Sequence, residues 1–389
     1  MNRESNELIE KLPITKQRFL SNTILNECYD NFKKYHEQWL DSDFLKNEVS
    51  TLTFLESSKF KELNMFHSLD NIIQENILSY HYFYQKNIID IDTNKYIVHF
   101  YYPTKYKQVK HRIIVYFNEC LMKIYVWLHF IQPFIRKGCS KIMNIYIWFT
   151  NLKKKLQKND KILNSIHANS AFTTSCQPKT DIYIYRQEEW MKVFFHETFH
   201  SFGLDFSHMN LDNYENKIKQ LFPVNSSKGI RLYESYTECW AELFTIILNS
   251  FFESTNKSDY KITCRKLYQN EIQFTTFQLI KILNHYNTNY EEFIENKKVI
   301  SENTSIISYY IIKYVLLYYC HDFEKWCKNF NGKLYLTFQE RNIKLFIDFI
   351  RENYKTSSLL LYIKKIEKIL LQLKLNNELR HTLRMTYHE

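Results

Sequence analysis

The chain has 389 residues, with 52 Lys and Arg against 42 Asp and Glu, 45% hydrophobic residues, and only four Gly and five Pro. The shortage of Gly and Pro excludes collagen-like and flexible low-complexity polymers, and it disfavours all-β sandwiches, whose tight turns need these residues. Length and apolar content suffice for one large core or several domains, so we expect a globular protein rich in helices.

The predicted elements follow in chain order. Apolar residues recur with the helical period through most of residues 1–92, as at Phe19, Ile24 and Cys28. Residues 96–102 alternate like a strand that ends at Pro103, and a long apolar helix is expected next. That helix covers 113–135; β-branched and aromatic strand candidates lie at 143–150, 167–174 and 181–185; and helical patterns return at 187–202, 212–222, 232–252 and through most of the last 130 residues.

These elements predict an α+β, mostly helical fold with a small mixed sheet. We expect a helical N-terminal region over 1–95, an α+β domain over 96–255 and a helical C-terminal region over 256–389.

The cysteines and the chain start bear on location. Eight Cys are scattered without a CxxC pair, which predicts reduced thiols and an intracellular protein. The first residues lack the apolar core of a secretory signal. Polar and charged residues such as Glu119 and Lys123 interrupt the most apolar stretch, 113–135, so we expect no membrane span. A soluble, cytoplasmic protein is the resulting prediction.

The positive charge is concentrated in one segment. Residues 101–165 contain 13 Lys and Arg and two acids, a net charge of +11, so the rest of the chain sums to −1. Bases interleaved with aromatic residues are one way to contact nucleic-acid phosphates. No recognised nucleic-acid motif accompanies them, and a solvated surface or one that meets an acidic partner is the simpler interpretation.

A metal-binding pattern occurs in the middle region, in the segment HETFH at residues 196–200. His196 and His200 are four residues apart on a predicted helix, so both imidazoles project from one face and can bind one metal ion. Glu197, between them, can reach a water on that ion without being a ligand. The competing interpretation is a core helix that buries two hydrogen-bonded imidazoles beside Phe195 and Phe199.

Two neighbouring features strengthen the metal interpretation. Gly203 follows His200 by three residues, where a left-handed residue can end the helix and turn the chain. A second predicted helix over 232–252 carries Glu234, Glu238 and Glu242, which share one face. An acidic stripe is ordinarily a solvated helix face, but no Lys or Arg occurs from 232 to 256, and solvated faces normally mix both signs.

With these residues the chain resembles the zincin metallopeptidases, and within them the gluzincin branch, over roughly residues 165–250. The resemblance implies Zn²⁺ bound by His196, His200 and a glutamate from the downstream helix. That glutamate commonly begins an E-x-x-[AS]-[DE] segment, which Glu238 does in ECWAE; Glu242 would then orient a histidine ligand. Glu234 is the alternative third ligand, one turn earlier, with Glu238 as the orienting carboxylate.

The metzincin branch does not fit. Its third histidine would fall at Phe206, which cannot bind zinc, and His208 lies two residues beyond. His208 is kept only as a minor candidate for a ligand or a transition-state donor.

The resemblance also implies a mechanism. Glu197 is the expected general base of peptide hydrolysis, and a second donor to the oxyanion is expected from Tyr236, Tyr233 or His208, each of which is also an ordinary packing candidate. Zincins bind the substrate along an edge strand, for which 169–174 is the expected segment; the same segment also suits an ordinary buried strand.

The predicted function is therefore a zinc endopeptidase acting on polypeptides. The neighbourhood of HETFHSFGLDF is also similar to uncharacterised metallopeptidase-like proteins of large cytoplasmic DNA viruses, which implies a viral protein in the host cytoplasm or the virion. The alternative is a non-catalytic interaction or structural protein, virion-associated or contacting nucleic acid through residues 101–165.

Overall fold

The computed structural model describes residues 3–42, 52–62, 66–104, 110–156, 160–227 and 229–388. It has the predicted α+β, mostly helical fold with a small mixed sheet. Contacts divide the chain into two units. We call Asn26–Lys153 with Ser170–Gly203 the sheet unit, and Met1–Leu25 with Lys154–Asn169 and Leu204–Glu389 the helical unit. The predicted regions 1–95, 96–255 and 256–389 are continuous in sequence, whereas each unit combines separate segments.

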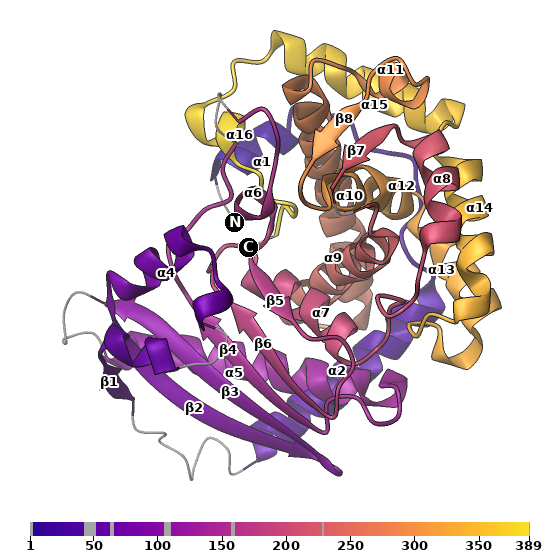
Figure 1. Cartoon of the computed structure of the whole chain (residues 1–389). Coiled ribbons are helices and arrows are strands. Elements are labelled where there is room, and N and C mark those ends of the chain that lie inside the picture. The colour runs from indigo at the N-terminus through magenta and orange to yellow at the C-terminus, as the bar shows by residue number, and fades with distance from the viewer. Residues whose placement is uncertain are drawn as a thin grey trace. The chain divides into compact units, whose positions relative to one another are not determined.

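The sheet unit contains one six-stranded sheet and the helices that cover it (Figure 1). Its elements are α2 (Asn22–Asp41, whose first turn falls in the helical unit), β1 (Thr53–Leu55), the 3₁₀ helices η1 (Ser57–Glu62) and η2 (Phe66–Ser68), α4 (Asn71–Leu78), β2 (His81–Ile91), β3 (Asn94–Thr104), α5 (Lys110–Ile131), η3 (Gln132–Phe134), β4 (Ile142–Trp148), β5 (Ala171–Thr173), β6 (Lys179–Ile184) and α7 (Trp190–Ser201).

The strands run in the order β1-β2-β3-β4-β6-β5. The central strands β3, β4 and β6 are parallel, and β5 pairs antiparallel with β6 at the edge. Helices α5 and α7 cover the same face, because Phe100 of β3 stacks on Phe117 of α5 and Tyr96 of β3 meets Phe202 just after α7. On the other face Phe60 of η1 meets the rings of Tyr101 and Trp148.

Two stretches within the predicted helical region 1–92 are strands, the short β1 and the longer β2. Residues 81–91, expected to be helical, form β2 instead. The side chains that β2 buries alternate, but two of them are Gln85 and Asn87, which hydrogen bond to each other at 3.2 Å. Polar residues on the buried face conceal the two-residue hydrophobic period that would identify a strand.

The helical unit is built mainly from helices. Its elements are α1 (Arg3–Ile9), α6 (Ser165–Ala168), α8 (Asp212–Leu221), β7 (Val224–Ser226), α9 (Leu232–Glu253), α10 (Lys257–His285), α11 (Tyr290–Ile294), β8 (Ile300–Glu302), the π-helix η4 (Ile307–Ile312), α12 (Lys313–Tyr318), α13 (Cys320–Asn331), η5 (Gly332–Leu334), η6 (Glu340–Asn342), α14 (Ile343–Asn353), α15 (Ser357–Gln372) and α16 (Asn377–His381). Strands β7 and β8 pair in parallel as a separate two-stranded sheet.

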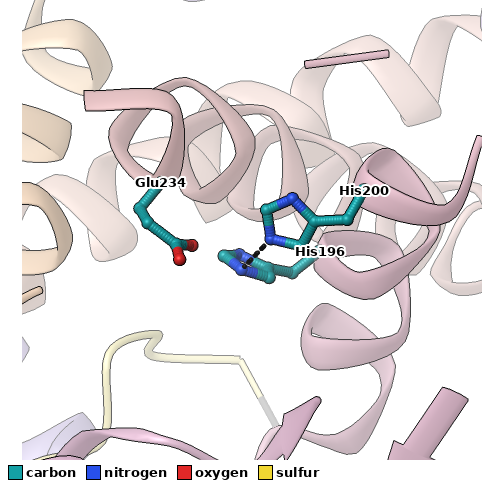
Figure 2. A group of neighbouring side chains, drawn as sticks. All are labelled: His196, His200 and Glu234. Carbon is teal, nitrogen blue, oxygen red and sulfur yellow. Dashed lines mark hydrogen bonds between the residues drawn. The ribbon is translucent and has the colours of Figure 1, made fainter. Parts of the chain in front are cut away.

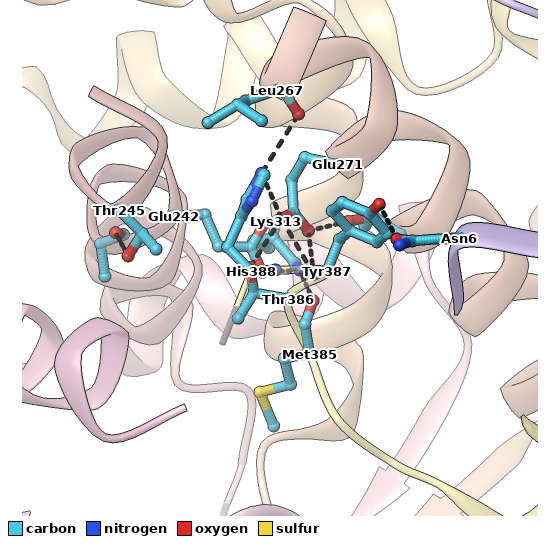
Figure 3. Close-up of polar contacts among 12 residues, drawn as sticks. Asn6, Glu242, Thr245, Leu267, Glu271, Lys313, Met385, Thr386, Tyr387 and His388 are labelled. Atoms are coloured by element: carbon cyan, nitrogen blue, oxygen red, sulfur yellow. Dashed lines mark hydrogen bonds and ion pairs between the residues drawn. The ribbon is translucent and has the colours of Figure 1, made fainter. Parts of the chain in front are cut away.

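The last described residues run through the interior of the helical unit (Figure 3). The Thr386 hydroxyl and the Tyr387 backbone N–H both donate to the buried carboxylate of Glu271, at 2.6 and 3.0 Å. His388 lies 3.2 Å from the Leu267 carbonyl, and burial lowers the pKa of its imidazole. These contacts tie the end of the chain to α10.

A fully buried ion pair fixes the central helix α9. Glu242 of α9 accepts a hydrogen bond from Lys313 at the start of α12, and neither side chain is exposed (Figure 3). Lys313 also donates to the Met385 carbonyl at 3.4 Å. An ion taken out of water needs such a partner, because desolvation of a lone charge costs several kcal/mol.

The apolar helical stretch Arg112–Phe134, which comprises most of α5 and all of η3, meets the length and composition test for a membrane span. Half of that window is buried inside the structure, and the core helix of a soluble protein passes the same test. The expected absence of a membrane span therefore stays a prediction.

Lys313→Met should lower the free energy of unfolding by about 3–5 kcal/mol, because it leaves the Glu242 carboxylate buried without its cation. The double variant Lys313→Met with Glu242→Leu should recover most of that loss, since no buried charge then remains. Urea unfolding of both variants measures the difference. A double variant as unstable as the single one would show that packing, rather than charge, explains the effect.

Candidate metal centre

The helix that carries HETFH is α7. It begins one turn after β6, and its N-cap residue Glu189 has a left-handed backbone with φ of 60°. The predicted start at Gln187 was therefore too early, and Glu188 and Glu189 precede the helix. Every residue from Lys192 to Ser201 is buried, so this helix belongs to the core of the sheet unit.

One face of α7 is fixed against α5. The Trp127 indole packs on Phe195 with ring centroids 4.4 Å apart and on Phe199 at 6.4 Å. Its N–H donates to the Thr198 hydroxyl at 3.0 Å, and that hydroxyl donates to the Phe195 carbonyl. Because these contacts fix the rotation of α7 about its axis, they also fix the direction of the neighbouring face that carries His196 and His200.

The end of α7 turns at Gly203, as the sequence predicts. Gly203 has φ of +66° and its N–H donates to the His200 carbonyl. A Cβ here would lie 3.1 Å from the Arg136 Cδ and the Cys139 Sγ, and 3.2 Å from the Cys176 Cβ. Only glycine fits this combination of backbone angle and close packing.

A disulfide lies against this turn. Cys139 and Cys176 are bonded, and the Cys176 N–H donates to the His200 carbonyl at 3.1 Å. The prediction that all cysteines are reduced is wrong for this pair, while the other six are free and buried. The two cysteines are 37 residues apart without a local motif, so only the tertiary fold brings them together.

The two histidines converge on one point. Their Nε2 atoms are 3.0 Å apart, and both side chains are buried. Two ligands of a tetrahedral zinc, each about 2.0–2.1 Å from the ion, are separated by about 3.3 Å, so this spacing is close to that of a metal-binding pair. The same spacing also allows one imidazole to donate to the other in the absence of an ion.

Glu234 at the start of α9 completes a three-residue group. Each of His196, His200 and Glu234 offers one ligand atom, and these three atoms lie within 4.8 Å of one another. All three residues are buried. Figure 2 shows the carboxylate facing the histidine pair. Two imidazole nitrogens and one carboxylate oxygen form a donor set typical of catalytic zinc.

The three glutamates of α9 have different surroundings. All are buried, which excludes the solvated acidic stripe. Glu234, the alternative third ligand, is the one in the group with the histidines, and the preferred Glu238 is not part of that group within the described residues. Glu242, expected to orient a histidine, accepts from Lys313. The geometry therefore favours Glu234, one turn before Glu238, as the third ligand.

Glu197, the predicted general base, is buried on α7. Its negative charge acts on the phenol of Tyr185, just after β6. Burial chiefly raises the pKa of Tyr185, and the charge of Glu197 adds to that shift. The carboxylate thus lies in a low-dielectric environment, where its interactions with other charges are strengthened.

The three predicted oxyanion donors have different surroundings. The Tyr236 hydroxyl donates to the Leu336 carbonyl at 3.0 Å, and its ring packs among aromatic side chains of the core. Exposed His208 pairs with Glu340 at 2.7 Å. Tyr233 is half-buried, and burial together with the charge of Glu234 raises the pKa of its phenol. The contacts of Tyr236 give it a packing role in the core.

Strand β5 has the position expected for a substrate-binding strand. It covers residues 171–173 of the expected segment 169–174 and forms the edge of the sheet. The Thr173 hydroxyl of β5 lies 2.8 Å from the Ser201 hydroxyl at the end of α7.

Phe206, the position that excluded a metzincin site, is fully buried, and its ring packs on that of Phe338 with centroids 4.1 Å apart.

The lysines of the basic segment differ in their surroundings. Lys105, Lys107 and Lys158 lie outside the described residues. Lys154 is 1% exposed, and Lys153 lies 3.7 Å from the buried carboxylate of Glu188. Lys154 is therefore poorly placed to contact phosphates, whereas the Lys153 side chain is 49% exposed.

Comparisons with protein-family models, curated proteins and solved structures give no significant match. The chemistry of the site therefore has to be inferred from its own residues. Sequence reasoning missed Lys313 as the partner of Glu242, and no local signal identifies it, because the two residues are 71 positions apart.

Gly203→Ala should destabilise the sheet unit more than Gly138→Ala. Both glycines have positive φ, which costs an alanine about 1–2 kcal/mol, but a Cβ at Gly138 meets nothing within 4 Å. The additional loss at Gly203 comes from the contacts with Arg136 and the disulfide, and chemical denaturation measures it. Equal losses would show that these contacts yield without cost.

Proposed function

We propose that this chain is a zinc-dependent metallopeptidase in which His196, His200 and Glu234 hold the ion. The observation that carries the proposal is the buried three-residue group, with its ligand atoms within 4.8 Å of one another. Three protein ligands of this kind leave a further coordination position for water, as catalytic zinc sites require. The HExxH spacing on a single helix supports the same assignment.

When bound, zinc supplies a Lewis acid that polarises a carbonyl and lowers the pKa of a bound water towards 7. Glu197 is the residue of this chain that handles the proton. It takes the proton of the attacking water and delivers it to the leaving amine, so that the peptide C–N bond breaks and the water oxygen remains in the new carboxyl group. A buried carboxylate beside the histidines suits this role.

Two further elements are assigned in the proposal. The edge strand β5 aligns an extended polypeptide by backbone hydrogen bonding, since its outer edge is not paired with another described strand. Tyr233, one residue before Glu234, donates to the developing oxyanion. Both assignments make an internal peptide bond, rather than a small molecule, the expected substrate.

The alternative function is an interaction or structural protein that uses the basic segment. No contact of the described lysines favours it over the peptidase, and Lys154 is unavailable at the surface. Metal content combined with cleavage separates the two functions.

The purified protein should contain about one zinc per chain, and His200→Ala should lose it because only one imidazole remains. Glu197→Gln should keep the metal but lower peptide cleavage by about 10²–10⁴-fold, because the proton acceptor is removed. Elemental analysis and digestion of a peptide library, with and without a chelator, provide the readouts. Protein without stoichiometric zinc, or cleavage unaffected by Glu197→Gln, would contradict the proposal.

The third ligand is tested by a matched pair on the same helix. Glu234→Ala should release the metal, because it removes the carboxylate of the buried group. Glu238→Ala removes an equally buried carboxylate one turn along and should keep most of the metal. Zinc affinity measured by competition with a chelating dye decides between them. Metal loss confined to Glu238→Ala would restore the register that the sequence motif favours.

A further inference from the structure

A cavity of about 360 Å³ lies in the helical unit, formed by residues 17–22 together with α10 and the start of α13. Its polar lining consists chiefly of Gln17, Arg18, Asn22, Arg265, Gln269 and His321. Small-molecule sites typically measure about 300–1,000 Å³, so this cavity suits a compact ligand and not a polymer.

The lining carries positive charge and no carboxylate. Arg18 and Arg265 both contribute guanidinium groups, and neither forms an ion pair within the described part of the chain; Arg265 donates to the neutral side chain of Asn22 at 3.2 Å. A cavity in the sheet unit also carries three cations, but Asp92 lines it with them. The absence of an acid distinguishes the helical-unit cavity.

Two acids next to lining residues are already paired. Glu324 accepts from the Ser21 backbone and hydroxyl and forms an ion pair with Lys328 at 2.8 Å. Asp322 pairs with Lys325 at 3.1 Å. These pairs offset the negative charges, so the two arginines keep an excess of positive charge at the cavity.

The backbone that carries Arg18 is held in place. The Thr15 N–H donates to the Gln269 side chain at 3.0 Å, and the Cys320 thiol donates to the Arg18 carbonyl at 3.4 Å. The Phe19 ring packs on Tyr268 at 4.8 Å. A ligand therefore has to order the long arginine side chains but not the chain segment that presents them.

His321 contributes a further hydrogen-bonding group to the lining. Its Nδ1 atom is buried and has no hydrogen-bond partner among the described residues, although a buried polar nitrogen without a partner costs about 1–3 kcal/mol. The lining thus includes a ring with unused hydrogen-bonding capacity.

We infer that this cavity binds a small phosphorylated molecule. The planar fork of arginine matches phosphate oxygens with two parallel hydrogen bonds, and two such forks with no competing carboxylate suit a dianion. The amide groups of Gln17, Asn22 and Gln269 can hydrogen bond to hydroxyls on the remainder of the ligand. This site is separate from the proposed metal centre and does not depend on it.

Isothermal titration calorimetry with inorganic phosphate and with ribose 5-phosphate, at constant ionic strength, tests the inference. Both should bind saturably, and ribose 5-phosphate should bind more tightly because of its hydroxyls. Arg18→Ala and Arg265→Ala should each weaken binding at least about tenfold, the effect expected for a lost charge-assisted hydrogen bond. Lys266→Ala, which removes an exposed cation next to Arg265 that does not line the cavity, is the matched control.

The same titration is repeated on chelator-treated protein, because phosphate also binds metal ions. Unchanged binding supports the cavity, whereas binding that disappears with the metal belongs to the histidine pair and overturns the inference. No saturable binding, or equal weakening by Lys266→Ala, would overturn it as well. Circular dichroism of each variant shows that the loss does not come from unfolding.

Discussion

The buried histidine pair on α7 is the constraint on which the candidate site depends. Two imidazole nitrogens 3.0 Å apart either share a proton or point their lone pairs at a common cation. The packing around α7 maintains this arrangement: Trp127 fixes the neighbouring face of the helix, and Gly203 lets its end turn beside the disulfide. A helix held this firmly presents ligands that need little reorganisation to bind a metal.

The buried carboxylates of α9 also need groups that compensate their negative charge. An ionised carboxylate in the interior needs a cation or several donors, since its desolvation is otherwise uncompensated. Glu242 has Lys313 for this purpose. A metal at the histidine pair would serve Glu234 in the same way. One helix then carries both a structural ion pair and a candidate ligand, which explains why its acidic residues lack the basic neighbours usual on a solvated surface.

The arginine cavity follows a different electrostatic principle. Arg18 and Arg265 are exposed, so their charges cost little to maintain in water, and binding there depends on geometry and on excess positive charge. The metal centre is buried and depends on a low dielectric. The two sites therefore call for different ligands, a small anion at the surface and a metal cation in the interior.

The sequence by itself was sufficient for features encoded over a few residues. The four-residue spacing put His196 and His200 on one helix face, Gly203 was recognisable as the turn that ends α7, and the β-branched runs marked β4, β5 and β6. These inferences succeed because helix and strand periods are local properties of the backbone.

Tertiary structure decided what spacing cannot encode. Glu234 and Glu238 differ by only about 6 Å along the helix, so their motifs are nearly equivalent and only the packed structure distinguishes them. Strand β2 was hidden because Gln85 and Asn87 occupy its buried face. The Tyr236 hydroxyl, the Cys139–Cys176 bond and the Lys313 partner of Glu242 all depend on residues distant in the chain. Such pairings are determined by how the elements pack, and the periodicity of the sequence does not indicate them.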